Sequence, residues 1–80
     1  MIDFTVYSRN GCHLCEDLLQ QLYQLQQVHK FSVTVIDVDT SPQLIEQYGT
    51  QVPVVTCGQQ QICHYFLDQA AVLQVLSNAG

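Results

Sequence analysis

Two strand-like segments separated by one amphipathic helix constrain the fold of this chain more than any other feature. Residues 3–7 and 31–38 are rich in Val, Ile, Thr and aromatic residues, which favour strands. Between them lies an apolar stripe at helical spacing, made by Leu14, Leu18, Leu22 and Leu25. We expect this helix to run from residue 12 to residue 28 or 29. Strands joined through one helix lie parallel, with a right-handed crossover.

The second half of the chain predicts two further helices. Ser41 and Pro42 suit the N-cap and the first residue of a short helix, which Gly49 should end. Asp68 is the expected N-cap of a last helix. The apolar positions of that helix are Ala71, Val72, Val75 and Leu76.

A β-hairpin is expected between these two helices. Residues 52–56 and 61–64 have strand composition, and residues 57–60 supply the turn that joins them in antiparallel fashion. With a two- or four-residue loop, Cys57 and Cys63 should point to opposite faces, as two separate thiols. Only a loop of odd length would change that expectation.

The predicted order is β-α-β-α-β-β-α, which suggests an α/β fold with a four-stranded mixed sheet covered by three helices. Eighty residues make one domain, residues 1–80, with room for a modest core.

Two cysteines stand at the junction of the first strand and the first helix. Cys12 and Cys15 are separated by two residues, which brings both sulfurs to one helix end, close enough to bridge. Gly11 lets the backbone bend tightly before them. Unpaired N–H groups and the positive end of the helix dipole lower the pKa of a thiol at this position. A CxxC between a strand and a helix is typical of thioredoxin-like redox motifs.

The charge balance excludes several classes of partner. The net charge is −5, and Arg9 and Lys30 are the only cationic residues. Nucleic acid and anionic membrane surfaces both need clusters of Lys or Arg, so neither is an expected partner.

No apolar run is long enough to span a bilayer, and the N-terminus has no signal-like segment, so we expect a cytoplasmic protein. In a reducing cytosol, four cysteines suggest catalysis or metal binding more than structural disulfides.

The segment Tyr-Ser-Arg-Asn-Gly-Cys-His-Leu-Cys at residues 7–15 resembles the active-site segment of glutaredoxins, and Val52-Pro53 resembles the Val-Pro step of that family. The resemblance implies a thioredoxin-like fold, with Cys12 as the nucleophile and Cys15 as the resolving thiol. It also implies a cis Pro53 beside the disulfide. Val52, next to Pro53, would then hold an extended substrate backbone through main-chain hydrogen bonds.

Three departures from glutaredoxins bear on substrate. His13-Leu14 replaces the usual Pro-Tyr, and Gln51 replaces the Thr that commonly precedes the Val-Pro step. Tyr65-Phe66-Leu67 occupies the stretch where the family commonly has Gly-Gly, and bulky side chains there obstruct close backbone approach. Glutathione is therefore a possible co-substrate that we expect to bind weakly.

Two residues near the cysteines carry open alternatives. Arg9 is either a plain surface charge or a cation that holds a thiolate or a ligand carboxylate. His13, if protonated, would stabilise a Cys12 thiolate, and otherwise it is a solvated side chain at the helix start. We expect no metal, because a zinc site would need ligands from the Cys57–His64 region, which lacks the two-residue spacing.

The sequence thus predicts a small monomeric thiol-disulfide oxidoreductase that acts on a disulfide-containing protein or a small thiol. It needs no organic or metal cofactor, only a reductant such as glutathione or a thioredoxin-type reductase. The alternatives are a binding module of the same fold that holds a metal or Fe–S cluster between chains, and an adaptor whose thiols are incidental.

Overall fold

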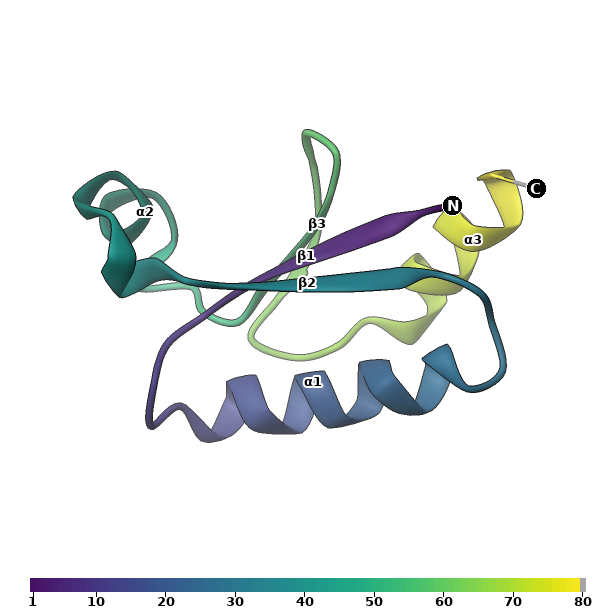
Figure 1. Ribbon diagram of the computed structural model, residues 1–80, viewed down its shortest axis with the longest axis horizontal. Helices are drawn as coiled ribbons and strands as arrows, with labels where there is room; N and C mark the ends of the chain where they lie inside the picture. Colours follow the sequence, from purple (N-terminus) through teal and green to yellow (C-terminus); the bar gives the residue numbers. More distant parts are fainter. Residues whose placement is uncertain (80) are drawn as a thin grey trace.

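The computed structural model describes residues 1–79. Its elements are β1 (Asp3–Ser8), α1 (His13–Gln26), β2 (Ser32–Asp37), the short 3-10 helix η1 (Val38–Thr40), α2 (Pro42–Tyr48), β3 (Val54–Cys57), β4 (Gln60–His64) and α3 (Gln69–Ala79). The sheet has the order β2-β1-β3-β4, with β1 and β2 parallel and the other pairs antiparallel. This is the α/β, thioredoxin-like fold that the sequence predicts (Figure 1). Within residues 1–79, no helix combines the length and the apolar content needed to cross a bilayer.

The hydrophobic core lies between the sheet and two of the helices. Its fully or nearly fully buried members are Phe4, Val6, Leu18, Leu22, Phe31, Val55 and Val72. Because Leu18 and Leu22 belong to α1 and Val72 belongs to α3, both helices cover the same face of the sheet. Of the predicted leucine stripe, Leu18 and Leu22 are buried and Leu14 and Leu25 are partly buried, on the helix α1 that runs along the sheet in Figure 1.

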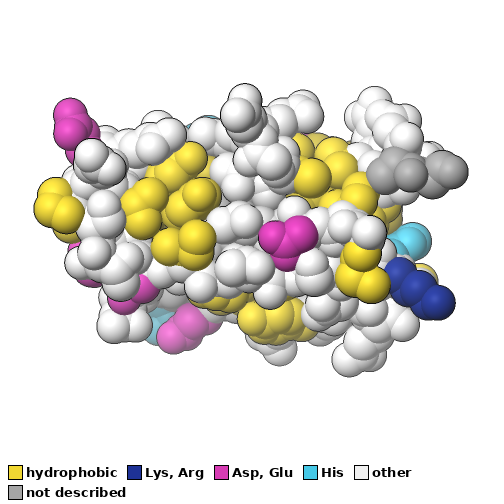
Figure 2. Space-filling model, turned by 45° about the horizontal axis from the view of Figure 1, so that its top comes forward, with side chains coloured by type: hydrophobic (Ala, Val, Ile, Leu, Met, Phe, Trp, Pro, Cys, Tyr) yellow, Lys and Arg dark blue, Asp and Glu magenta, His cyan; other side chains and the backbone are white. Residues whose placement is uncertain are grey.

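The opposite face of the sheet is covered near one end by α2. Tyr7, which alternates with the buried Val6 along β1, stacks on Tyr48 of α2 with ring centroids 4.2 Å apart. Burial and the neighbouring Tyr7 raise the pKa of Tyr48 above its usual value. At the other end of β1, the carboxylate of Asp3 accepts hydrogen bonds from the Ser32 and Thr34 hydroxyls. Figure 2 shows few charged side chains on the face in view, where hydrophobic patches alternate with uncharged polar surface.

The helix ends follow the predicted signals, with two exceptions. Gly49 is the C-cap of α2, and an Asp68 carboxylate oxygen accepts the Ala71 N–H at 3.1 Å. Ser41 occupies the N-cap position of α2, but its side chain makes no capping hydrogen bond. Helix α1 ends at Gln26, two or three residues before the predicted end at residue 28 or 29.

The prediction that Cys57 and Cys63 face opposite sides of the hairpin was wrong. Cys57 pairs with Gln60 across a two-residue turn, yet Val55 pairs with Cys63 because the register shifts within the hairpin. Ile62 is the extra residue of this β-bulge, and it reverses the alternation on β4. Since paired residues share a face, both thiols point to the core side, where they pack against the hydrophobic cluster. Both are free, as predicted.

Candidate active site

The candidate active site lies at one end of the sheet, where three loops meet. The strand pairs at this end are Ser8 with Asp37, Tyr7 with Val54, and Val54 with His64. The loops that leave this end are residues 9–12, 49–53 and 65–68. The sheet register therefore brings the CxxC turn, the Val-Pro step and the segment before α3 to a common end of the molecule.

Cys12 and Cys15 form a disulfide at the start of α1, with their Cα atoms 5.2 Å apart. Gly11 turns the backbone into this position with φ of +74°, a conformation that glycine adopts without steric cost. Cys12 is the N-cap of α1, and its sulfur accepts a hydrogen bond from the Cys15 N–H at 3.1 Å. In a reduced protein, the same N–H and the helix dipole would stabilise negative charge on the Cys12 sulfur.

The two cysteines differ in their access to solvent. Cys15 is only 2% exposed, because it lies one turn inside α1 on the buried face. Cys12 is partly exposed at the helix end. This difference is the one that the position of the motif predicts.

The side chains of the first helical turn have opposing electrostatic effects. His13 is exposed at the first position of α1, so a protonated imidazole there would favour a Cys12 thiolate. Glu16 and Asp17 are also exposed, and their carboxylates oppose a nearby thiolate although they complement the helix dipole.

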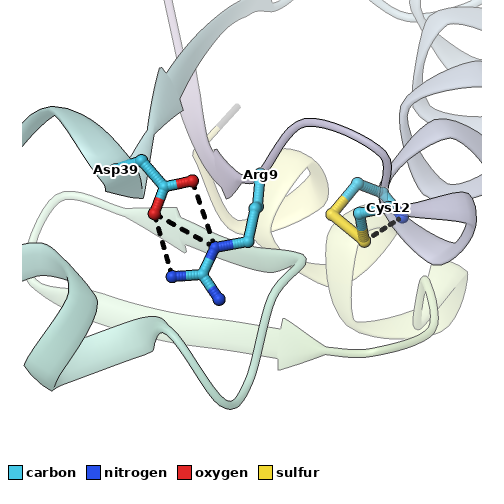
Figure 3. The surroundings of a disulfide bond; sticks show 4 residues. Arg9, Cys12 and Asp39 are labelled. Carbon is cyan, nitrogen blue, oxygen red and sulfur yellow. Dashed lines mark hydrogen bonds and ion pairs between the residues drawn. A yellow bond between two sulfur atoms is a disulfide. The ribbon is translucent and has the colours of Figure 1, made fainter.

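Arg9 is held by a carboxylate that the sequence analysis did not identify. Its guanidinium donates hydrogen bonds to Asp39 of η1, from Nε at 3.2 Å and from Nη2 at 3.0 Å. Figure 3 shows the guanidinium turned toward Asp39 and away from the disulfide. Asp37 fixes Asp39 in turn, because its side chain accepts the Asp39 N–H at 2.9 Å. The pair is exposed and adds little to stability, but it neutralises the cation nearest to Cys12 in sequence.

The Val52–Pro53 peptide bond is cis, and the Pro53 ring is buried. The Pro53 carbonyl accepts the Tyr65 N–H at 2.9 Å. Within the described part of the chain, the backbone N–H and C=O of Val52 make no hydrogen bond. Val52 therefore presents a free donor and acceptor at the end of the sheet that carries the disulfide.

Tyr65 is a second residue that the sequence analysis did not place in this role. Its φ of +64° lies in the left-handed region, which costs a non-glycine residue roughly 1–3 kcal/mol. Its hydroxyl donates a hydrogen bond of 2.7 Å to the Thr50 carbonyl, and its N–H binds the Pro53 carbonyl. Tyr65 thus ties the loop after β4 to both sides of Val52.

The comparisons with known proteins agree with this architecture. The model of the family described as Glutaredoxin-like domain (DUF836) matches residues 3–77. The chain belongs to this glutaredoxin-like family. Protein Ne2328 from Nitrosomonas europaea, solved by NMR, is similar to this glutaredoxin-like domain with 36% identity and a TM-score of 0.85; the match covers 94% of this chain and 91% of that one.

Two more distant structures share the fold of this glutaredoxin-like domain. Protein XcR50 from X. campestris is 24% identical with a TM-score of 0.75, and the match covers 96% of this chain and 99% of that one. A malarial protein is 10% identical with a TM-score of 0.69, covering 98% and 96%. Among curated proteins, none matches.

Outside the CxxC motif, the side chains of the glutaredoxin-like domain that could act as metal ligands do not cluster. Among residues 1–79, no three side chains of His, Cys, Asp or Glu gather in an arrangement that could hold a metal ion.

We predict that iodoacetamide labels the reduced protein first at Cys12. The N-terminal end of α1 favours the thiolate of Cys12. Cys15 reacts more slowly because it is buried, and Cys63 reacts more slowly because burial raises its pKa above the usual value. Mass spectrometry of the digested protein after short labelling times would rank the four thiols. Labelling of Cys15 before Cys12 would reverse the assignment of nucleophile and resolving thiol.

Proposed function

We propose that this protein is a thiol-disulfide oxidoreductase, which reduces or exchanges disulfides through Cys12 and Cys15. The observation that carries the proposal is the asymmetry of the pair. Both sulfurs lie at bonding distance at the start of α1, but only Cys12 is open to solvent. A nucleophilic thiol must meet the substrate, whereas a resolving thiol needs to meet only its partner.

The reaction begins when the Cys12 thiolate attacks one sulfur of a substrate disulfide. The substrate S–S bond breaks, a mixed disulfide forms, and the departing thiolate takes a proton from water. Cys15 then loses its proton and attacks the Cys12 sulfur, which releases the second substrate thiol and closes the Cys12–Cys15 bond. The substrate gains two electrons and the protein loses two, which an external thiol reductant or a thioredoxin-type reductase must return.

The free backbone groups of Val52 supply a docking edge for this chemistry. An extended substrate segment would pair with the Val52 N–H and C=O as an added strand. Tyr65 supports that edge by holding the carbonyls of Thr50 and Pro53 on either side.

Insulin reduction with two alternative electron donors tests the proposed function. One assay supplies glutathione with glutathione reductase, and the other supplies thioredoxin reductase. We expect NADPH consumption that depends on this protein with at least one donor. If neither donor supports turnover, and the dithiol-reduced protein leaves insulin disulfides intact, the proposal is wrong.

We predict that glutathione binds with a Kd on the order of millimolar, or about −4 kcal/mol. The bulky Tyr65–Leu67 segment replaces glycine, the net charge is −5, and Arg9 is already paired with Asp39. Calorimetric titration into the Cys12→Ser variant would measure the affinity without exchange. Raised salt should strengthen binding, because it screens the net repulsion between two anionic partners.

The Arg9–Asp39 pair offers a matched test of this explanation. Asp39→Asn releases the guanidinium and should strengthen glutathione binding, whereas Arg9→Glu should weaken it further. If the protein with native Arg9 and Asp39 binds glutathione with micromolar affinity, neither the missing glycines nor the paired arginine limits that affinity.

A further inference from the structure

A groove beside the disulfide is not used by the chemistry described above. It has a volume of about 200 Å³ and is formed by one side of α1 and the loop after β4. Its lining residues are Leu14, Asp17, Leu18, Gln21, Tyr65, Phe66 and Leu67. Leu14 lies between the two cysteines in the sequence, so one end of the groove adjoins the CxxC segment.

The loop wall of the groove holds an aromatic ring out in solvent. Phe66 is 70% exposed, although its neighbour Leu67 packs against the core. The conformation is fixed, since Tyr65 is bonded to Thr50 and Pro53, and the Phe66 N–H donates to the His64 carbonyl at 2.7 Å. Backbone strain at Tyr65 next to the exposed ring of Phe66 is typical of a binding surface.

Apart from the imidazoles of His13 and His64, the charged side chains around the groove are acidic. Asp17 lines it, and Glu16 and Asp68 are exposed next to it in the sequence. Arg9 is paired with Asp39. Lys30 follows the C-terminal end of α1, which lies about 20 Å from the N-terminal end because each helical residue rises about 1.5 Å. Within residues 1–79, no lysine or arginine therefore offsets the carboxylate in this groove.

We propose that the groove binds a polypeptide segment of a disulfide-bonded protein substrate, one that carries an apolar side chain next to its cysteine and a lysine or arginine just beyond. This inference rests on the proposed disulfide exchange at Cys12. The apolar side chain packs between Leu14 and Phe66, and the cationic one reaches Asp17. Complementary charge favours encounter with such a segment and disfavours acidic ones.

The helix sets the spacing of the recognised residues. Leu14 and Asp17 are three residues apart, so they are separated by about 4.5 Å along the axis of α1. An extended peptide advances about 3.3 Å per residue. Because successive side chains of an extended peptide point to opposite faces, the basic residue should follow the apolar residue by two positions to share its face. The expected pattern is cysteine, apolar residue, any residue, basic residue.

Three short peptides, each carrying thionitrobenzoate on its cysteine, test this pattern. They contain Cys-Leu-Ala-Lys, Cys-Leu-Ala-Glu or Cys-Ser-Ala-Lys, and the release of the chromophore by reduced protein gives second-order rate constants. We expect Cys-Leu-Ala-Lys to react about tenfold faster than either of the others, which corresponds to about 1.4 kcal/mol. Equal rates for the three peptides would overturn the inference.

Paired variants locate the effect in the groove. Asp17→Lys should reverse the preference between Lys and Glu peptides, whereas Glu46→Lys, the same charge change on α2, should not. Phe66→Ser should slow the reaction of Cys-Leu-Ala-Lys about tenfold and leave the rate of hydroxyethyl disulfide reduction unaffected. Val28→Ser removes a comparably exposed side chain beyond the far end of α1 and serves as its control. Equal effects of variant and control would mean that the groove does not select substrates.

A binding measurement separates this inference from the proposed function. The Cys12→Ser, Cys15→Ser double variant cannot exchange disulfides, but its groove is intact. NMR titration with a Ser-Leu-Ala-Lys peptide should shift the amides of Leu14 and Phe66, and a Ser-Leu-Ala-Glu peptide should not. Binding without any disulfide reduction by the native protein would refute only the oxidoreductase. Absence of shifts would refute the groove, as would a dimer that Phe66→Ser dissociates, because a second copy would then occupy it.

Discussion

Replacing Cys12 by serine should slow disulfide reduction by roughly a thousandfold or more, the scale of loss when a nucleophile is removed. A serine hydroxyl stays protonated near neutral pH and cannot open a disulfide, whereas the thiolate at the start of α1 can. Initial rates of insulin reduction, with wild-type and variant protein at equal concentration, would measure the effect. Comparable rates for both proteins would assign the reaction to another group.

The Cys15→Ser variant should behave differently, because the first attack remains possible. It should accumulate a mixed disulfide between Cys12 and the substrate, visible as an added mass under non-reducing conditions. Cys57→Ala removes a half-buried thiol outside the motif and is the matched control. The Cys57→Ala variant should keep a rate within about twofold of wild type, because the energetic coupling between sites that share no partners is small.

The local signals in the sequence were sufficient to predict the fold. The leucine stripe of α1 and the β-rich segments on either side are patterns of neighbouring residues, and they determine the parallel unit of β1 and β2. Gly11, Gly49 and Asp68 act on the backbone within a few residues of themselves, so their roles in turns and caps were also accessible.

The missed features all depend on partners that are distant in the sequence or on register. Arg9 and Asp39 are 30 residues apart, and the chain offers seven acidic residues from which composition cannot select. The bulge at Ile62 shifts one strand by a single residue, which reverses the face of Cys63 without any glycine or proline to signal it. Register of this kind is decided by packing of the whole hairpin.

Tyr65 shows how a departure from a family pattern can add structure as well as remove it. From the sequence, bulky residues in place of Gly-Gly meant only obstruction. In the structure, the backbone at Tyr65 still adopts a left-handed conformation, and the tyrosine hydroxyl reaches the Thr50 carbonyl. The Tyr65–Leu67 segment thus holds the backbone on both sides of Val52 and forms the side of the groove where Phe66 is exposed.

Phe4→Ala should lower the free energy of unfolding by about 3–5 kcal/mol, the range for truncating a buried phenylalanine. Phe4 is completely buried on β1, and its ring meets Phe31 edge to face with centroids 5.2 Å apart. A chain of this length has a total stability of about 4–12 kcal/mol, so the loss is a large share of the whole. Urea denaturation followed by far-UV circular dichroism would measure it.

Tyr23→Ala is the control for this experiment, because Tyr23 is a large aromatic residue on α1 that is 45% exposed. Its truncation should cost less than about 1 kcal/mol. A similar loss in the two variants would mean that burial in the core between the sheet and α1 does not dominate stability. A large loss for Phe4→Ala alone would show that stability depends on the core that Phe4 shares with Leu18 and Leu22 of α1, the helix that also carries Cys15. The variant should therefore also expose Cys15 to alkylation when reduced, at denaturant concentrations where the wild-type protein still protects it.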